Sequence, residues 1–135
     1  MKDHKEPKLP DKLNLKEKYP QLFPVDVDGK TSIALFGIEC GAGWYKLLDE
    51  LCADIVRLAS DEGIPAPTVR QIKEKFGTLR FYIDAETDAM YERICEAELE
   101  SSKICERCGK PGELTATGGW YRTLCPEHLA DLARK

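Results

Sequence analysis

Two closely spaced pairs of metal-ligand residues lie in the last quarter of this chain of 135 residues. The first pair is Cys105 and Cys108 in the segment CERCG, and the second is Cys125 and His128 in CPEH. Two residues separate the members of each pair, so one tight turn can direct both side chains at the same ion. Because zinc prefers four tetrahedral nitrogen or sulfur ligands, these residues predict a structural zinc site.

The residues around each pair fit the local structure that such a site requires. Gly109 follows the first pair, where the turn needs left-handed backbone angles. Pro126 stands at the first position of a helix predicted over residues 126–133, which places the second pair on the first turn. Turn residues bound two short segments, 113–116 and 120–124, which we expect to form a hairpin. Knuckle, hairpin and helix in this order predict a treble clef, an arrangement that serves many functions.

The remaining cysteines raise the alternative of a disulfide framework, which an exported protein would permit. The segment KDHKEPK after Met1 is polar and contains no apolar signal sequence, so we expect a reducing cytoplasm. Cys40, Cys52 and Cys95 are then left over, and the last two fall on the apolar stripes of predicted helices. We expect them to be small core residues and not ligands.

Length and composition predict three parts. Residues 1–12 are rich in lysine, polar and interrupted by proline, which predicts a flexible arm. Residues 13–102 can form one modest core, whereas residues 103–135 have too few apolar side chains and need their metal to fold. No apolar run approaches the roughly 18 residues of a membrane span. We therefore expect a soluble α+β protein with a small helix-and-hairpin body and a C-terminal zinc-binding, treble-clef-like module.

The clearest secondary-structure signal lies between residues 44 and 62. Apolar residues recur there at steps of three and four, as on the buried face of a helix, and Gly63 and Pro65 end the pattern. The predicted face consists of Trp44, Leu47, Leu48, Leu51, Cys52, Ile55, Leu58 and Ala59.

A second helix is predicted from Asp88 to about Ser102, with Thr87 as its N-terminal cap. Its predicted inward face consists of Met90, Tyr91, Ile94, Cys95 and Leu99. The other positions are rich in acids, which we expect to face solvent.

Two elements are predicted before the first long helix. A short helix lies within residues 12–23, where Pro20 interrupts or ends it. Residues 25–29, VDVDG, alternate and then turn, and residues 32–38, SIALFGI, have the apolar character of a strand. These two segments predict a hairpin, or a strand that follows a tight turn.

Residues 68–83 have two interpretations. Thr68 with Gln71 resembles a capping box, which would begin a helix that Gly77 ends. Alternatively, residues 69–75 and 78–83 form a hairpin, because apolar and polar residues alternate cleanly in the second of these segments. The second strand follows from this alternation, while the first half stays open.

The sequence argues against an enzyme. His4 lies in the polar arm and His128 is assigned to zinc, so no histidine remains as a general base. A catalytic zinc also needs an open coordination position, which four protein ligands leave no room for. Gly41-x-Gly43 lacks the third glycine of a dinucleotide-binding motif, so we expect it to form the turn into the first long helix. We therefore predict a protein without catalytic activity.

Four residues of the possible hairpin combine positive charge with an aromatic ring, namely Lys73, Lys75, Arg80 and Tyr82. With a two-residue turn they share one face, and Lys73 lies opposite Arg80, a pairing of like charges that is unfavourable by itself. Either the acidic helix neutralises these cations, through Asp88, Glu92 or Glu96, or the face holds an anion such as single-stranded nucleic acid. The net charge of −4 favours the first alternative.

Four motifs together resemble a family of small, uncharacterised proteins found in bacteriophages and prophages. The motifs are FGIECGAGWYKLLDELC, QIKEKFGTLRFYI, ICERCGKPG and GGWYRTLCPEH, and the resemblance covers roughly residues 33–128. It favours the hairpin for residues 69–83. It also implies an accessory role in a host cell, because phage proteins of this size often redirect or block host machinery, including defence systems. We therefore expect a zinc protein that binds a host protein, with nucleic-acid binding through residues 70–83 as the alternative.

Overall fold

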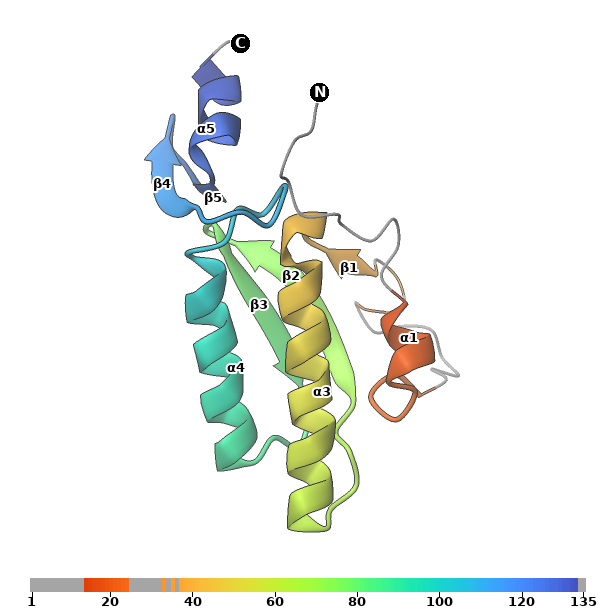
Figure 1. Cartoon of the computed structure of the whole chain (residues 1–135). Coiled ribbons are helices and arrows are strands. Elements are labelled where there is room, and N and C mark those ends of the chain that lie inside the picture. The colour runs from red at the N-terminus through yellow and green to blue at the C-terminus, as the bar shows by residue number, and fades with distance from the viewer. Residues whose placement is uncertain (1–13, 25–32, 34, 36, 134–135) are drawn as a thin grey trace.

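The structure of the chain, a computed structural model, describes residues 14–24, 33, 35 and 37–133. Within these residues the chain is an α+β protein with two sheets, as predicted. Figure 1 shows two long helices, α3 (Tyr45–Glu62) and α4 (Asp88–Ser101), side by side over one face of the larger sheet. The smaller sheet and the last helix lie together at one end of the molecule, next to the N-terminal end of α3 and the C-terminal end of α4.

Helix α3 forms where the apolar spacing predicts it. The side chains that it buries are Leu47, Leu48, Leu51, Cys52, Ile55 and Ala59. Trp44 is also fully buried, but it belongs to a short 3-10 turn, η1 (Ala42–Trp44), that leads into the helix. Gly63 ends α3 with a φ of 68°, a left-handed conformation that favours glycine.

The larger sheet contains β1 (Ile38–Glu39), β2 (Val69–Lys75) and β3 (Thr78–Ile83) in that order. Strands β1 and β2 are parallel, while β2 and β3 form an antiparallel hairpin whose turn residues, Phe76 and Gly77, both have positive φ. The hairpin interpretation of this segment is therefore confirmed, and the helical alternative is wrong.

Helix α4 begins at the predicted cap, since the Thr87 hydroxyl oxygen accepts the N–H of Met90 at 3.2 Å. The buried stripe is narrower than predicted and consists of Met90, Ile94, Ala97 and Ser101. Tyr91, Cys95 and Leu99 are exposed, so the prediction that they face inward is wrong. Helix α4 packs against α3 and β3, and Tyr91, Cys95 and Leu99 lie on the part of the helix surface that these elements leave uncovered.

The N-terminal segments agree only in part with prediction. Helix α1 (Leu15–Lys18) lies within the predicted range, and Leu15 and Leu22 join the core. The predicted strand over residues 32–38 is wrong at Ile33 and Leu35, which are helical, and a described strand covers only Ile38–Glu39, while residues 32, 34 and 36 lie outside the described residues. The predicted arm 1–12 and the segment 25–29 lie outside the described residues.

The C-terminal elements follow the predicted order. After the first cysteine pair come β4 (Glu113–Thr117), β5 (Trp120–Leu124) and α5 (Pro126–Ala133). Strands β4 and β5 form a hairpin that turns at two glycines of positive φ, Gly118 and Gly119. This is the treble-clef-like order of knuckle, hairpin and helix. None of the described helices combines the length and apolar character needed to cross a membrane.

Candidate metal centre and the surfaces around it

The first ligand pair lies in a tight loop between α4 and β4. The Cys105 N–H donates to the carbonyl of Lys110 at 2.8 Å, and the Gly109 N–H donates to the carbonyl of Cys105 at 2.9 Å. These two bonds close the loop around Cys108. Gly109 has a φ of 85°, the left-handed conformation predicted for this position.

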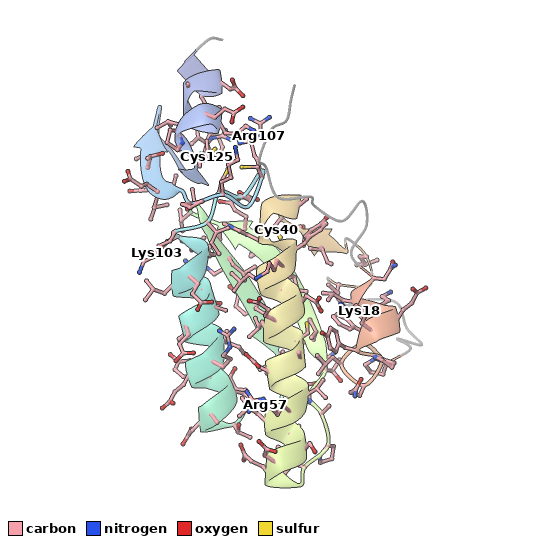
Figure 2. The ribbon with its side chains drawn as sticks, viewed as in Figure 1. Lys18, Cys40, Arg57, Lys103, Arg107 and Cys125 are labelled. Carbon is pink, nitrogen blue, oxygen red and sulfur yellow. The ribbon has the colours of Figure 1, made fainter. Side chains whose placement is uncertain are left out.

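The second pair lies where β5 gives way to α5. The Cys125 carbonyl accepts the N–H of Leu129 at 2.9 Å, which is the first turn of the helix. Residues three apart lie on the same side of a helical turn, so the side chains of Cys125 and His128 leave α5 in the same direction. Figure 2 shows Cys125 at the module end of the molecule, with Arg107 of the cysteine loop close by.

The four ligand atoms lie within 4.8 Å of one another. The sulfur atoms of Cys108 and Cys125 are 3.7 Å apart, and Nδ1 of His128 is 3.4 Å from the sulfur of Cys105 and from that of Cys125. In a tetrahedral zinc site, bonds of about 2.3 Å to sulfur and 2.0 Å to nitrogen separate two sulfurs by about 3.8 Å and sulfur from nitrogen by about 3.5 Å. The observed distances fit this geometry and far exceed the roughly 2.05 Å bond of a disulfide.

The environment of the four residues also suits a cation. The three cysteines are buried and His128 is partly buried. Burial raises the pKa of the Cys105 thiol. Hydrogen bonds from nearby backbone N–H groups and from the His128 ring lower this pKa by a larger amount, so that it is about 7. Burial and the neighbouring thiols instead raise the pKa of Cys108 to about 12. A bound cation would replace the Cys108 proton and offset the crowding of thiolates.

The other cysteines take no part in this group. Figure 2 places Cys40 at the N-terminal end of α3, on the body side of the module. Burial, followed by the charges of Glu106 and Glu74, raises its pKa to about 12. Cys52 is buried in the core, as predicted, and burial raises its pKa to about 12 as well.

The body holds the cysteine loop through the segment Gly41 to Trp44. The Gly43 N–H donates to the carbonyl of Glu106 at 2.7 Å, and the Trp44 indole N–H donates to the carbonyl of Ile104 at 2.8 Å. A Cβ on Gly43 would lie 2.1 Å from the carbonyl oxygen of Cys105. The two glycines therefore form the predicted turn into α3 and also receive the backbone of the loop. The Gly-x-Gly-Trp pattern is the only sequence signal that could have indicated this contact.

A second contact joins the β2–β3 turn to the β4–β5 hairpin. The Thr123 hydroxyl donates to the carbonyl of Gly77 at 2.7 Å, and Thr123 is fully buried. A Cβ on Gly77 would lie 2.5 Å from Cδ1 of Leu114 and 3.0 Å from the backbone nitrogen of Arg122. The four motifs quoted from the sequence thus meet at one junction between the body and the C-terminal module.

This junction leaves three large apolar side chains in solvent. Phe76, Tyr121 and Leu114 are 63%, 50% and 44% exposed. The rings of Phe76 and Tyr121 meet edge to face, with centroids 6.1 Å apart and planes at 88°. We call these three residues the junction patch. The patch could not be predicted from the sequence, because its members come from two hairpins that only the tertiary structure brings together.

The four predicted binding residues lie together on one face of the larger sheet. Ile72, Leu79 and Phe81 are buried in the core beneath the helices, and side chains alternate along a strand. The neighbouring positions therefore face the other way, and the register places Lys73 opposite Arg80, as predicted. We call the residues Gln71, Lys73, Lys75, Thr78, Arg80 and Tyr82 the open sheet face.

The ion pairs expected for these cations do not form. Lys73, Lys75 and Arg80 make no ion pair within 4.0 Å of any described acid, so the predicted pairing with Asp88, Glu92 or Glu96 is wrong. Helix α4 covers the opposite side of the sheet, which keeps its solvent-facing acids away from the cations.

Comparisons with protein-family models, curated proteins and solved structures find no match.

Proposed function

We propose that this chain is a phage-type accessory protein that binds zinc structurally and acts by binding a host protein, without catalysis of its own. Three sulfurs and one nitrogen suit zinc in both softness and tetrahedral geometry. All four coordination positions would be taken by protein side chains, which is typical of structural and not catalytic zinc. The resemblance to phage and prophage proteins supports a partner in the bacterial host.

The junction patch is the observation that carries the proposal of a protein partner. Aromatic residues are enriched in protein interfaces, and exposed clusters of them mark interaction sites. Tyr121 and Phe76 support one another through their ring contact, so the cluster keeps its shape at little cost in side-chain entropy. Since the two hairpins meet through Thr123 and Gly77, the patch depends on the zinc module being folded.

A pull-down from nuclease-treated lysate of the bacterial host tests the proposal. The bait is the zinc-loaded full chain, the test variant is Leu114→Ser with Tyr121→Ser, and the control variant is Tyr91→Ser with Leu99→Ser. The control residues are 56% and 64% exposed, so both double variants remove comparable apolar surface. We expect the wild type and the control to retain one host protein at a defined stoichiometry that the test variant loses.

Two results would overturn the proposal. One is equal capture by the wild type and the junction-patch variant. The other is loss of the host protein only in the α4 control, which would move the binding site to that helix. Binding of the purified partner, measured by calorimetry with each variant, would separate a direct contact from capture through a third protein.

A further inference from the structure

The open sheet face carries three cations whose charge the described part of the protein does not neutralise. Lys73 and Arg80 lie directly across the ladder from one another, an arrangement that repels by itself. The nearby acids are engaged elsewhere: Glu98 accepts the N–H of Phe81, and Asp84 pairs with Arg70 at 3.1 Å. Glu39 is the register partner of Lys73 on β1, but no ion pair joins the two side chains.

Arg80 gives the clearest evidence that the positive charge of this face is not neutralised by the described residues. Its Nε atom is buried and has no hydrogen-bond partner among the described residues. A guanidinium has five N–H donors and normally satisfies those that are withdrawn from water. Glu98 lies close enough for Arg80 to lower its pKa, although burial raises that pKa overall. The Nε–H of Arg80 is therefore unpaired among the described residues, and its guanidinium forms no ion pair with a described acid.

Aromatic rings flank the cations at both ends of the hairpin. Tyr82 is 41% exposed at one end, and Phe76 is exposed at the turn with the Lys75 ammonium 5.7 Å from its ring centroid. Lys73 and Lys75 are two residues apart on one strand, so they are spaced by about 6.8 Å. A row of cations beside exposed rings suits an extended strand of phosphates with unstacked bases.

We infer that the open sheet face binds single-stranded nucleic acid, with Lys73, Lys75 and Arg80 on the phosphates and Tyr82 stacking on a base. This function goes beyond the proposed protein binding and uses a surface that meets the junction patch only at Phe76. The exposed rings favour a single strand over a duplex, because unstacked bases can stack on aromatic side chains and paired bases cannot. Strand addition at the outer edge of β3 is also blocked, because α4 side chains accept its Leu79 and Phe81 N–H groups.

The overall acidity of the chain does not oppose this inference strongly. Helix α4, which carries many of the acids, lies on the other side of the sheet, and its Glu98 reaches the sheet at the backbone of Phe81. Screening at physiological salt weakens interactions between exposed charges beyond about 8 Å. The local cations therefore determine the attraction at the open sheet face, while the distant acids reduce non-specific binding elsewhere.

Fluorescence anisotropy with labelled oligothymidylate and an RNA of equal length tests the inference on the zinc-loaded full chain. Affinity should fall with salt on a log-log plot, and Lys73→Gln, Lys75→Gln and Arg80→Gln together should reduce the slope by about 2, or about 0.7 for each charge. Tyr82→Ser should weaken binding several-fold while leaving the slope unchanged. A matched triple control is Lys16→Gln, Lys46→Gln and Arg57→Gln, which removes the same charge from α1 and α3 and should leave binding intact.

Several outcomes would overturn the inference: no binding by the wild type at physiological salt, equal losses in the two triple variants, or equally tight binding of a duplex. Displacement by poly-glutamate as readily as by oligonucleotide would assign the face to an acidic protein instead. Thermal unfolding of each variant separates lost contacts from lost folding. The junction-patch variant should still bind oligonucleotide, so a failure of the proposed protein binding remains distinguishable from a failure here.

Discussion

Gly43 lies in the turn that leads into α3 and packs directly against the cysteine loop. Its N–H bonds to Glu106, and the space where a side chain would begin is filled by the carbonyl of Cys105. Both neighbours are backbone atoms of a loop that the cysteines hold in place, so neither can move aside easily. Because glycine carries no side chain, the loop can pack this closely against the body. Folding of the C-terminal module is therefore coupled to folding of the body.

Gly43→Ala should destabilise the folded chain by about 3 kcal/mol, at the upper end of the usual cost of overpacking. Denaturant unfolding followed by tryptophan fluorescence would measure this, since Trp44 is buried beside the contact. Gly118→Ala is the control: its φ of 58° is strained, but no atom lies within 4 Å, so the cost should be only about 1 kcal/mol. Equal stability of Gly43→Ala and wild type would show that the two parts are not tightly joined.

Cys108 is the ligand to substitute in a test of metal binding, because burial and the neighbouring thiols raise its pKa and a cation would replace its proton. We expect one zinc per chain in carefully reduced protein and clearly less in Cys108→Ser. Structural zinc contributes on the order of 10 kcal/mol to its own module, so the module should unfold while the central turns of α3 keep their amide protection. Metal analysis and hydrogen exchange measure the two effects. Cys95→Ser, which alters an exposed cysteine, should retain full zinc.

At the scale of elements, one arginine ties the two long helices together. Arg93 of α4 is 16% exposed and donates from Nε to the Asp54 carboxylate of α3 at 2.6 Å. Glu100 adds a weaker contact to the same guanidinium at 3.6 Å. The pair is more buried than the Lys46–Glu50 pair on the surface of α3. Loss of its acid leaves a largely buried cation without its principal partner, which costs more than losing an exposed pair.

Asp54→Asn should therefore destabilise the protein by roughly 1 kcal/mol at neutral pH, and Glu50→Gln by much less. Burial raises the pKa of Asp54, but hydrogen bonds from Arg93 and Arg57 lower it more, so its pKa in the folded state lies below the usual value. The stability from Asp54 is then fully present above a pH of about 4 and is lost as the pH falls through the lower folded pKa. Unfolding curves across this range should show wild type and variant converging in acid. A constant difference would contradict the assignment.

At the scale of the whole molecule, we expect the two proposed binding surfaces to differ in their dependence on metal. The junction patch needs the β4–β5 hairpin to be docked on Gly77, which the zinc module provides. The open sheet face belongs to β2 and β3 and rests on the core of α3 and α4. Bound zinc would thus organise the junction patch through the C-terminal module, whereas the open sheet face meets that module only at the β2–β3 turn.

Removal of zinc by a chelator should abolish binding of the protein partner and preserve most of the affinity for oligonucleotide. The physical reason is that the core residues beneath the open sheet face come from the body alone. Anisotropy and calorimetry on the same metal-free sample measure both, and re-addition of zinc provides the control. Parallel loss of the two activities would mean that the body does not hold its fold without the module.

The sequence by itself determined the features that depend on neighbouring residues. Cys105, Cys108, Cys125 and His128 could be assigned because ligand spacing, a left-handed glycine and a helix-starting proline act within a few positions of one another. The same local logic located α3, the Thr87 cap and the β3 strand. It failed at Ile33 and Leu35, where apolar character suits helix and strand alike.

Only the tertiary structure decided which surfaces stay exposed. The width of the α4 stripe depends on what packs against the helix, so Tyr91 and Leu99 could not be placed from periodicity alone. The expected ion pairs of Lys73 and Arg80 depended on which side of the sheet α4 covers, and sequence order does not specify that side. The junction of Gly43 and Gly77 with the zinc module joins segments far apart in the chain. Such contacts follow from the packing of whole elements, because burial is a property of the assembled core and not of any one segment.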